Sequence, residues 1–249
     1  MRSIRRPLAL GGAILGLILL APLTHALGAN GPGSRPAPPN CPTFNSGSFH
    51  KSTTINNPYF PAVPGTRFTY KGFVQKTPVV DIVTVTHNSP TIDGVKTIEV
   101  RDQVFEAEVP TEDTLDWYAQ DDQGNVWYFG ELATQLPAGT HDGSWTAGID
   151  GAQPGYIMEA APKVGDIYCQ ENAPGAAQDA AEVLSVSASR SVPYGDGTFS
   201  GNVLQTKDYS LLEPKNEHKF YEPGVGMLEA ISITGPSEDI QLDTIEHGG

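Results

Sequence analysis

The chain has 249 residues, with 29 Asp and Glu against 15 Lys and Arg, and a formal net charge of −14 at pH 7. This acidic balance repels nucleic acids and anionic lipid surfaces, so we expect no nucleic-acid partner. With 39% hydrophobic residues the chain can bury one substantial core, which favours one domain or two closely joined halves.

Residues 1–26 have the layout of a secretory signal peptide. Three arginines precede a continuous apolar run from Pro7 to Leu23, and the small residues up to Ala26 provide a cleavage site. Cleavage there lowers the Lys and Arg count to 12 and leaves all 29 Asp and Glu. We therefore expect a secreted or periplasmic protein with no membrane attachment after cleavage. An uncleaved N-terminal anchor is the alternative.

Residues 27–54 are rich in Pro, Gly, Ser and Asn and have no periodicity, which predicts a flexible leader. The two cysteines are Cys41 and Cys169. In an oxidising compartment an even pair tends to form a disulfide, and this one would tie the leader to the second half of the chain. Two free thiols are the alternative.

From residue 55 onward the pattern is that of antiparallel strands. Alternating or β-branched runs at Thr66–Val74, Val79–His87 and Val95–Val109 are separated by short turns. Asp113–Glu131 then places two aromatic runs on either side of a polar turn with Gly124 near its tip. Aromatic residues favour strands, and Asp, Gly and Asn favour tight turns. We expect this β-hairpin to be the packing centre.

Residues 136–155 form a connection rich in Gly and Pro, of the kind that is often functional when it is long. The pattern of the first half then returns at an offset of about 100 residues, which suggests an internal duplication. The predicted β domain, residues 55–234, thus has two similar halves, 55–135 and 156–234. One short stretch, Ala173–Glu182, has helical character, and residues 235–249 are expected to be an acidic tail.

These patterns predict a mainly β fold. We expect an antiparallel curved sheet, open and barrel-like, with about ten strands contributed by the two similar halves.

Local motifs for catalysis or metal binding are absent from the sequence. There is no G-x-S-x-G motif, no zinc-ligand spacing and no glycine-rich phosphate loop before a helix. The turn Asp121–Asn125 could hold calcium, and His141 with Met158 and Met227 could form a copper site. Turn geometry and core packing explain these residue types equally well. We expect no metal and no cofactor.

The aromatic residues remain as candidates for a binding site. A curved sheet with an aromatic face beside a long loop can hold a small apolar or sugar-like ligand. The candidate ligand-binding residues are Trp117, Trp127, Tyr128 and Trp145. A purely hydrophobic core is the alternative for most of them.

The sequence favours an exported, non-catalytic binding or carrier module for a small apolar ligand. One alternative is an extracellular hydrolase, for which Asp113, Asp116 and Glu131 beside the hairpin are the candidate carboxylates. Another is a cell-surface structural or interaction protein without a small ligand.

Three stretches carry a resemblance: NNPYFPAVPGTRFTY, DTLDWYAQDDQGNVWYFGE and HKFYEPGVGMLEA. Together they resemble a family of exported bacterial proteins with no assigned function, over residues 55–230. More distantly, the strand–turn pattern of the second half is similar to exported lipoproteins with an open, LolA- or LolB-like half-barrel, although the lipobox cysteine is missing. The resemblance implies an extracytoplasmic β protein and no particular activity.

Overall fold

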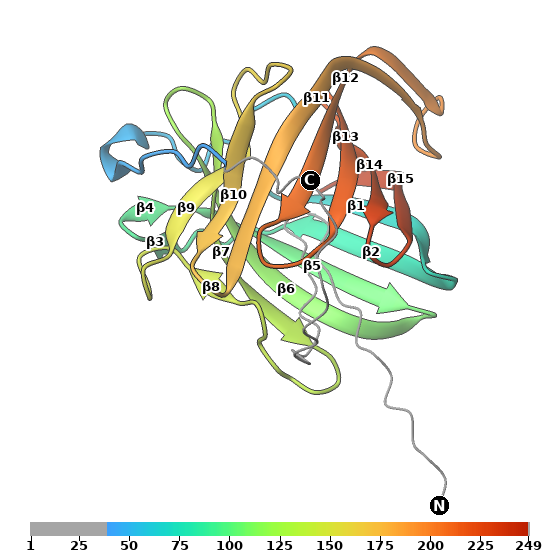
Figure 1. Ribbon diagram of the computed structural model, residues 1–249, viewed down its shortest axis with the longest axis horizontal. Helices are drawn as coiled ribbons and strands as arrows, with labels where there is room; N and C mark the ends of the chain where they lie inside the picture. The colour runs from blue at the N-terminus through green and yellow to red at the C-terminus, as the bar shows by residue number, and fades with distance from the viewer. Residues whose placement is uncertain (1–38, 249) are drawn as a thin grey trace, which may run out of the picture.

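The computed structural model describes residues 39–248, which are almost entirely β-structure (Figure 1). The expected signal peptide, residues 1–26, and the leader up to residue 38 lie outside the described residues. Between residues 39 and 248, no helix has the length and apolar character needed to span a membrane.

The strands of the large sheet are, in chain order, β1 (Thr66–Val74), β2 (Thr77–Val85), β5 (Ile98–Glu106), β6 (Val109–Gln120), β7 (Val126–Gln135), β8 (Trp145–Thr146), β9 (Gln153–Met158), β10 (Ile167–Ala173), β11 (Ala177–Ser191), β12 (Thr198–Ser210), β13 (Asn216–Glu222), β14 (Gly226–Thr234) and β15 (Glu238–His247). β3 (Thr91–Ile92) and β4 (Val95–Lys96) form a separate two-stranded hairpin, and η1 (Ser46–Ser48) is a short 3-10 helix.

The large sheet closes on itself as an antiparallel barrel. Its order is β6-β5-β2-β1-β15-β14-β13-β12-β11-β10-β9-β7-β8, and β6 also pairs with β7. Twelve strands thus form the wall, while β8 pairs with Gly130 and Glu131 in the middle of β7, beyond the residues that pair with β9. The predicted aromatic hairpin is confirmed as β6–β7, with Gly124 in its turn.

The closed barrel corrects the expectation of an open sheet of about ten strands. All of β8 and the first half of β9 fall within the connection expected at 136–155. β15 takes up most of the expected acidic tail and pairs with both β1 and β14. Its Ile240 and Leu242 are buried and alternate with the polar residues Asp239, Gln241 and Asp243, which is a strand pattern. Closure is favoured because it leaves no edge strand with unpaired backbone groups.

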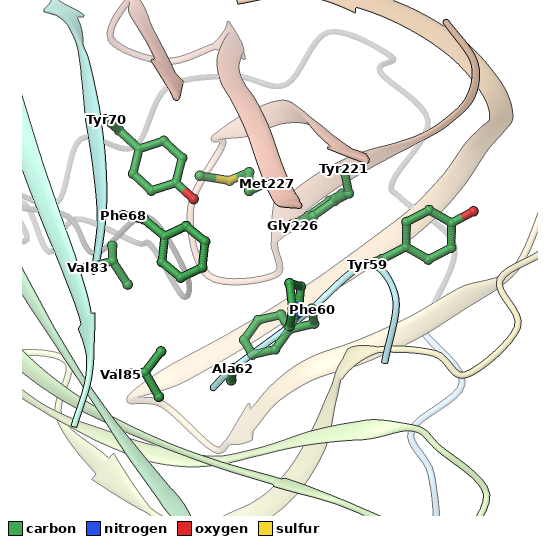
Figure 2. A pocket seen from close by; sticks show the side chains of 11 residues that line it. Tyr59, Phe60, Ala62, Phe68, Tyr70, Val83, Val85, Tyr221, Gly226 and Met227 are labelled. Carbon is green, nitrogen blue, oxygen red and sulfur yellow. The ribbon is translucent and has the colours of Figure 1, made fainter. Parts of the chain in front are cut away.

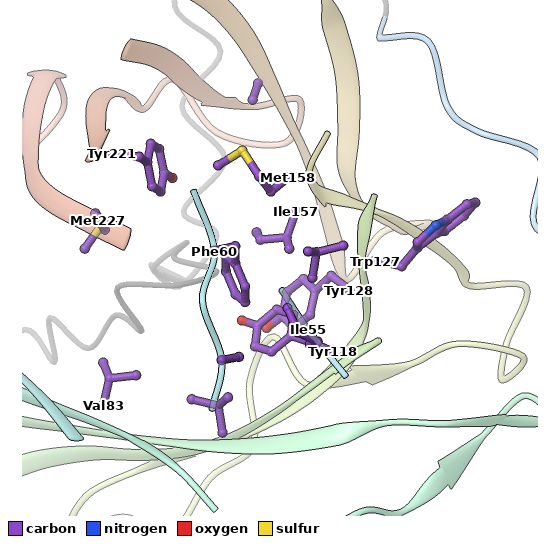
Figure 3. Close-up of a cluster of buried hydrophobic side chains, with 14 of the residues drawn as sticks. Ile55, Phe60, Val83, Tyr118, Trp127, Tyr128, Ile157, Met158, Tyr221 and Met227 are labelled. Atoms are coloured by element: carbon purple, nitrogen blue, oxygen red, sulfur yellow. The ribbon is translucent and has the colours of Figure 1, made fainter. Parts of the chain in front are cut away.

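The segment that precedes β1, residues 55–62, covers one end of the barrel; we call it the cap (Figures 2 and 3). Its Phe60 is 5% exposed and its ring centroid lies 5.0 Å from that of Tyr118. The side-chain amide of Asn57 donates to the carbonyl oxygens of Gly124 and Glu159, which belong to two different strand connections. Burial of Phe60 and these hydrogen bonds together hold the cap on the barrel.

Side chains fill the barrel interior beneath the cap. Figure 2 shows Phe60 between side chains from opposite walls, with Val83 on β2 and Tyr221 on β13. The cavity that remains there is about 30 Å³. That is space for roughly one water molecule, so this end of the barrel is a packed core.

The residues before the cap lie against the outside of the barrel. Cys41 forms the predicted disulfide with Cys169 on β10. Phe44 and Phe49 both pack edge-on against Phe129 of β7, with ring centroids 5.6 and 5.7 Å away. The described part of the expected flexible leader, residues 39–54, is therefore fastened to the wall.

The two expected halves correspond to two successive meanders, β1-β2-β5-β6-β7 and β10 to β14. A barrel in which most neighbouring strands are consecutive in the chain would show this order with or without duplication. The internal duplication stays a prediction.

Candidate functional site

Carboxyl groups line the half of the barrel interior that is farther from the cap; we call them the acidic belt. They are Asp81 (β2), Asp102 (β5), Glu112 and Asp116 (β6), Glu131 (β7), Glu171 (β10), Asp179 (β11), Asp208 (β12), Glu217 (β13) and Glu238 (β15), and all are buried. Side chains two residues apart on a strand point to the same face. Asp81 is two residues from Val83, and Asp116 is two residues from Tyr118. Val83 and Tyr118 face the cap inside the barrel, so the two acids also point into the interior.

Strand pairing brings the members of the belt together. Directly paired positions are Asp116 with Glu131, Glu171 with Asp179, and Asp208 with Glu217. Like charges so close together cannot all ionise in a buried site. The belt therefore has to contain protonated acids or compensating cations.

Two lysines compensate the negative charge on one side of the belt. The Lys219 ammonium lies 3.3 Å from Asp208, and Lys215 lies 3.7 Å from Glu217 and 3.6 Å from Glu238. Burial acts to lower the pKa of Lys219, but the neighbouring carboxylates, Asp208 first, outweigh it and raise that pKa. Lys219 is therefore charged at neutral pH.

The acids on the adjoining strands β6, β7, β10 and β11 have raised pKa values. Burial, followed by neighbouring carboxylates, raises the pKa of Asp116, Glu131 and Asp179 well above the usual range, and that of Glu171 to about 8. The Tyr128 hydroxyl donates to Asp116 Oδ1 at 2.5 Å and lies 3.1 Å from Glu131 Oε2, and this hydrogen bonding offsets part of the burial effect. These shifts favour the protonated form of the acids in this region.

A pocket of about 280 Å³ opens beside this protonated region, where β8 runs along β7; we call it the Trp117–Trp145 pocket. It is lined by Trp117, Glu131, Leu132, Ser144, Trp145, Thr146, Ile149, Asp150, Ala152, Ala173, Pro174 and Ala176. Most of these side chains are apolar, and the two acids are the charged groups among them.

β8 and β7 position Trp145 in this pocket. Gly130 permits the close pairing, because a Cβ atom there would overlap the backbone of Trp145. The indole Nε1 of Trp145 donates to Glu171 Oε1 at 3.1 Å, and its ring meets Tyr128 edge-on with centroids 5.4 Å apart. Trp145 is thus held in place by a hydrogen bond and by aromatic packing.

The four candidate ligand-binding residues end up in different surroundings. Trp117 and Trp145 line the pocket together, and Tyr128 lies directly behind Trp145. Trp127 lies on the other side of β7, as Figure 3 shows, where Phe44 and Phe49 cover it. It is 4% exposed and does not reach the pocket. Ligand binding itself stays a prediction.

The three candidate hydrolase carboxylates are also separated. Asp113 forms an ion pair with Arg101 on the partly exposed outer face. Asp116 is fully buried behind the Tyr128 hydroxyl, while Glu131 reaches the pocket. The structure therefore brings one of these three carboxyl groups, that of Glu131, to the pocket.

The suggested metal-binding residues have other contacts. Oδ1 of Asp121 accepts hydrogen bonds from the backbone N–H groups of Gln123 and Asn125, and Oδ2 accepts one from Trp127 Nε1. The carboxylate thereby fixes the β6–β7 turn. Met158 and Met227 are buried in the core, whereas His141 is exposed.

The acidic belt was not expected from the sequence, although a signal for it was present. In the runs VVDIV and VRDQV, Asp81 and Asp102 take inward positions of a strand that otherwise carries apolar residues there. A charged residue at an apolar position of an alternating strand is therefore the pattern that would have identified the belt.

No protein-family model matches the chain, and no curated protein sequence matches it. Two solved structures are similar in overall arrangement. A Bacteroides fragilis protein classed as exported, with a YmcC-like fold, gives a TM-score of 0.45 at 12% identity over 76% of this chain and 98% of its own. A Parabacteroides distasonis protein classed as a lipoprotein gives 0.35 at 11% identity, over 76% and 98%. Similarity at this level assigns neither family nor function.

Proposed function

We propose that the protein is an extracytoplasmic, non-catalytic binding module that takes a small, partly apolar ligand in the Trp117–Trp145 pocket. The observation that carries this proposal is the pocket itself, about 280 Å³ in volume with two tryptophans among its lining residues. Tryptophan provides a large, rigid apolar surface together with a polar N–H group. The extracytoplasmic location rests on the N-terminal signal pattern.

The volumes of the two spaces favour binding of a small ligand in this pocket over transport of a ligand inside the barrel. Pockets for drug-sized ligands typically have about 300–1,000 Å³, so a single ring or a branched alkyl group fits here. The cavity beneath the cap is about 30 Å³ and is too small. A hollow of about 410 Å³ around Phe73 lies over β1, β2 and β15, but it is more open and has no tryptophan in its lining.

The hydrolase alternative is less well supported. Hydrolysis by paired carboxyl groups requires both to reach the substrate. Of the three carboxylates predicted from the sequence, Glu131 lines the pocket, Asp116 is fully buried and hydrogen-bonded by Tyr128, and Asp113 is paired with Arg101 on the outer face. We therefore favour binding without catalysis.

The three tryptophans of the chain make a direct binding test possible, because each gives one indole N–H signal in a nitrogen–proton NMR spectrum. We would titrate a panel of single-ring and branched-alkyl fragments, both neutral and charged. A ligand in the pocket should shift the signals of Trp117 and Trp145 and leave that of Trp127 in place, since Trp127 lies beneath Phe44 and Phe49.

Two matched variants test whether the ligand binds in the pocket. Ile149 lines the pocket and is 58% exposed, whereas Ile233 on β14 is 47% exposed and lies outside the pocket lining. Ile149→Asn should weaken binding, and Ile233→Asn should not. If no fragment shifts the two indole signals, or if both variants bind alike, the pocket is not a binding site. The interaction-protein alternative would then be preferred.

A further inference from the structure

We propose that the ligand of the Trp117–Trp145 pocket carries a positive charge, and that the pocket recognises small alkylated ammonium ions such as choline. This inference rests on the proposed function and names the chemical class of its ligand.

The charged groups at the pocket have one sign. Glu131 and Asp150 line it, and none of the described lining residues is Lys, Arg or His. Glu131 lies at the inner side, within the acidic belt, and Asp150 lies at the exposed side. A carboxylate in a partly buried site attracts a cation more strongly than it would in water. No basic side chain in the lining would hold an anionic ligand, and the Asp150 carboxylate would repel it.

The aromatic side chains also favour a cationic ligand. The face of a tryptophan ring attracts ammonium groups more strongly than that of tyrosine or phenylalanine, and aromatic cages with nearby carboxylates bind quaternary ammonium ions. Trp145 is fixed before any ligand arrives, by its hydrogen bond to Glu171 and its contact with Tyr128. Little side-chain freedom is then lost on binding.

The remaining lining residues suit the methyl groups of such an ion. Leu132, Ile149 and Ala176 provide apolar contacts beside the two tryptophans. A trimethylammonium group cannot donate hydrogen bonds, so a wall with few hydrogen-bond acceptors leaves no donor of the ligand unpaired, while the carboxylates offset the cost of desolvating its charge. A pocket of about 280 Å³ is large enough for it.

Binding of a cation is coupled to a proton on Glu131. Burial, then neighbouring carboxylates, raises the pKa of Glu131 well above the usual range. The titratable groups that face it are Asp116, Glu112 and Tyr118 on β6, Tyr128 on β7, Glu171 on β10 and Asp179 on β11. A cation favours ionised Glu131 and displaces the proton, so affinity for the cation should rise with pH.

The experiment compares choline with 3,3-dimethylbutan-1-ol, which has the same shape but carbon in place of the charged nitrogen. Isothermal titration of the folded protein should show choline binding about tenfold more tightly. Choline affinity should increase between pH 6 and pH 9, whereas that of the alcohol should stay constant. Asp150→Asn should weaken choline binding about threefold and leave the alcohol unchanged. Asp142→Asn, an exposed change in the same connection, should affect neither.

Each outcome distinguishes the two proposals. If the alcohol binds as tightly as choline, the pocket binds ligands but does not select a cation. If choline binds more tightly but its affinity is independent of pH, the cation is not coupled to a proton on Glu131, and that part of the proposal is wrong. If choline and the alcohol both fail to bind while another fragment shifts the Trp117 and Trp145 signals, the pocket stands and the ammonium class is wrong. If no compound binds, both proposals are wrong.

Discussion

Glu171→Gln should stabilise the protein at alkaline pH. Glu171 is 3% exposed, and its Oε1 accepts the hydrogen bond from Trp145. Glutamine keeps that acceptor and the side-chain shape, and its amide can donate to the neighbouring Asp179 carboxyl, which lies opposite in the strand pairing. The substitution therefore removes the titration of one buried acid with little change in packing.

The size of the effect follows from the pKa of Glu171, which burial and the nearby Glu131 raise from 4.5 to about 8. Below pH 4.5 the group is protonated in both the folded and the unfolded chain, and the free energy of unfolding does not depend on it. Between 4.5 and 8 the unfolded chain loses the proton and the folded chain keeps it, so stability falls as pH rises. The full loss is roughly 4–5 kcal/mol, reached near pH 8.

Urea denaturation of both proteins from pH 5 to pH 9 measures this effect. The free energies of unfolding should be similar at pH 5 and should separate by about 4 kcal/mol in favour of the variant at pH 8. Glu108→Gln, at an exposed turn between β5 and β6, provides the control and should run parallel to the unchanged protein. A constant difference between Glu171→Gln and the unchanged protein across this range would refute the protonated belt.

Three further changes test the fold. Reducing the Cys41–Cys169 disulfide, which joins positions 128 residues apart, should lower the free energy of unfolding by about 2–4 kcal/mol; free-thiol labelling of denatured, unreduced protein should find no thiol. Phe60→Ala should cost about 3–5 kcal/mol in urea denaturation, because the ring is buried in the cap; a cost below 1 kcal/mol would mean that the cap does not pack as described. Gly72→Ala should separate β1 from β15, because a Cβ atom there overlaps the β15 backbone; faster amide hydrogen exchange along both strands would show it, and unchanged exchange would contradict the close pairing.

Local sequence patterns were sufficient to predict the strands of the first half and the aromatic hairpin. Alternation along Thr66–Val74 and the turn around Gly124 reflect preferences of adjacent residues, which act in the same way in any fold. The stretch Ala173–Glu182 shows where such preferences fail. Its alanines favour a helix in isolation, but Asp179 and Ala181 point into the barrel from β11, and pairing with β10 decides the conformation.

A β protein with a signal pattern, a hairpin and a cysteine pair fit for a disulfide can be inferred from the residues in chain order. The three-dimensional arrangement was needed to show that β15 closes the barrel, that Trp127 and Trp145 lie in different surroundings, and that acids from most of the wall strands meet in one belt. The physical reason is that strand alternation specifies which side chains share a face. Which face becomes the interior, and which distant strands supply its other walls, depends on pairings between residues far apart in the chain.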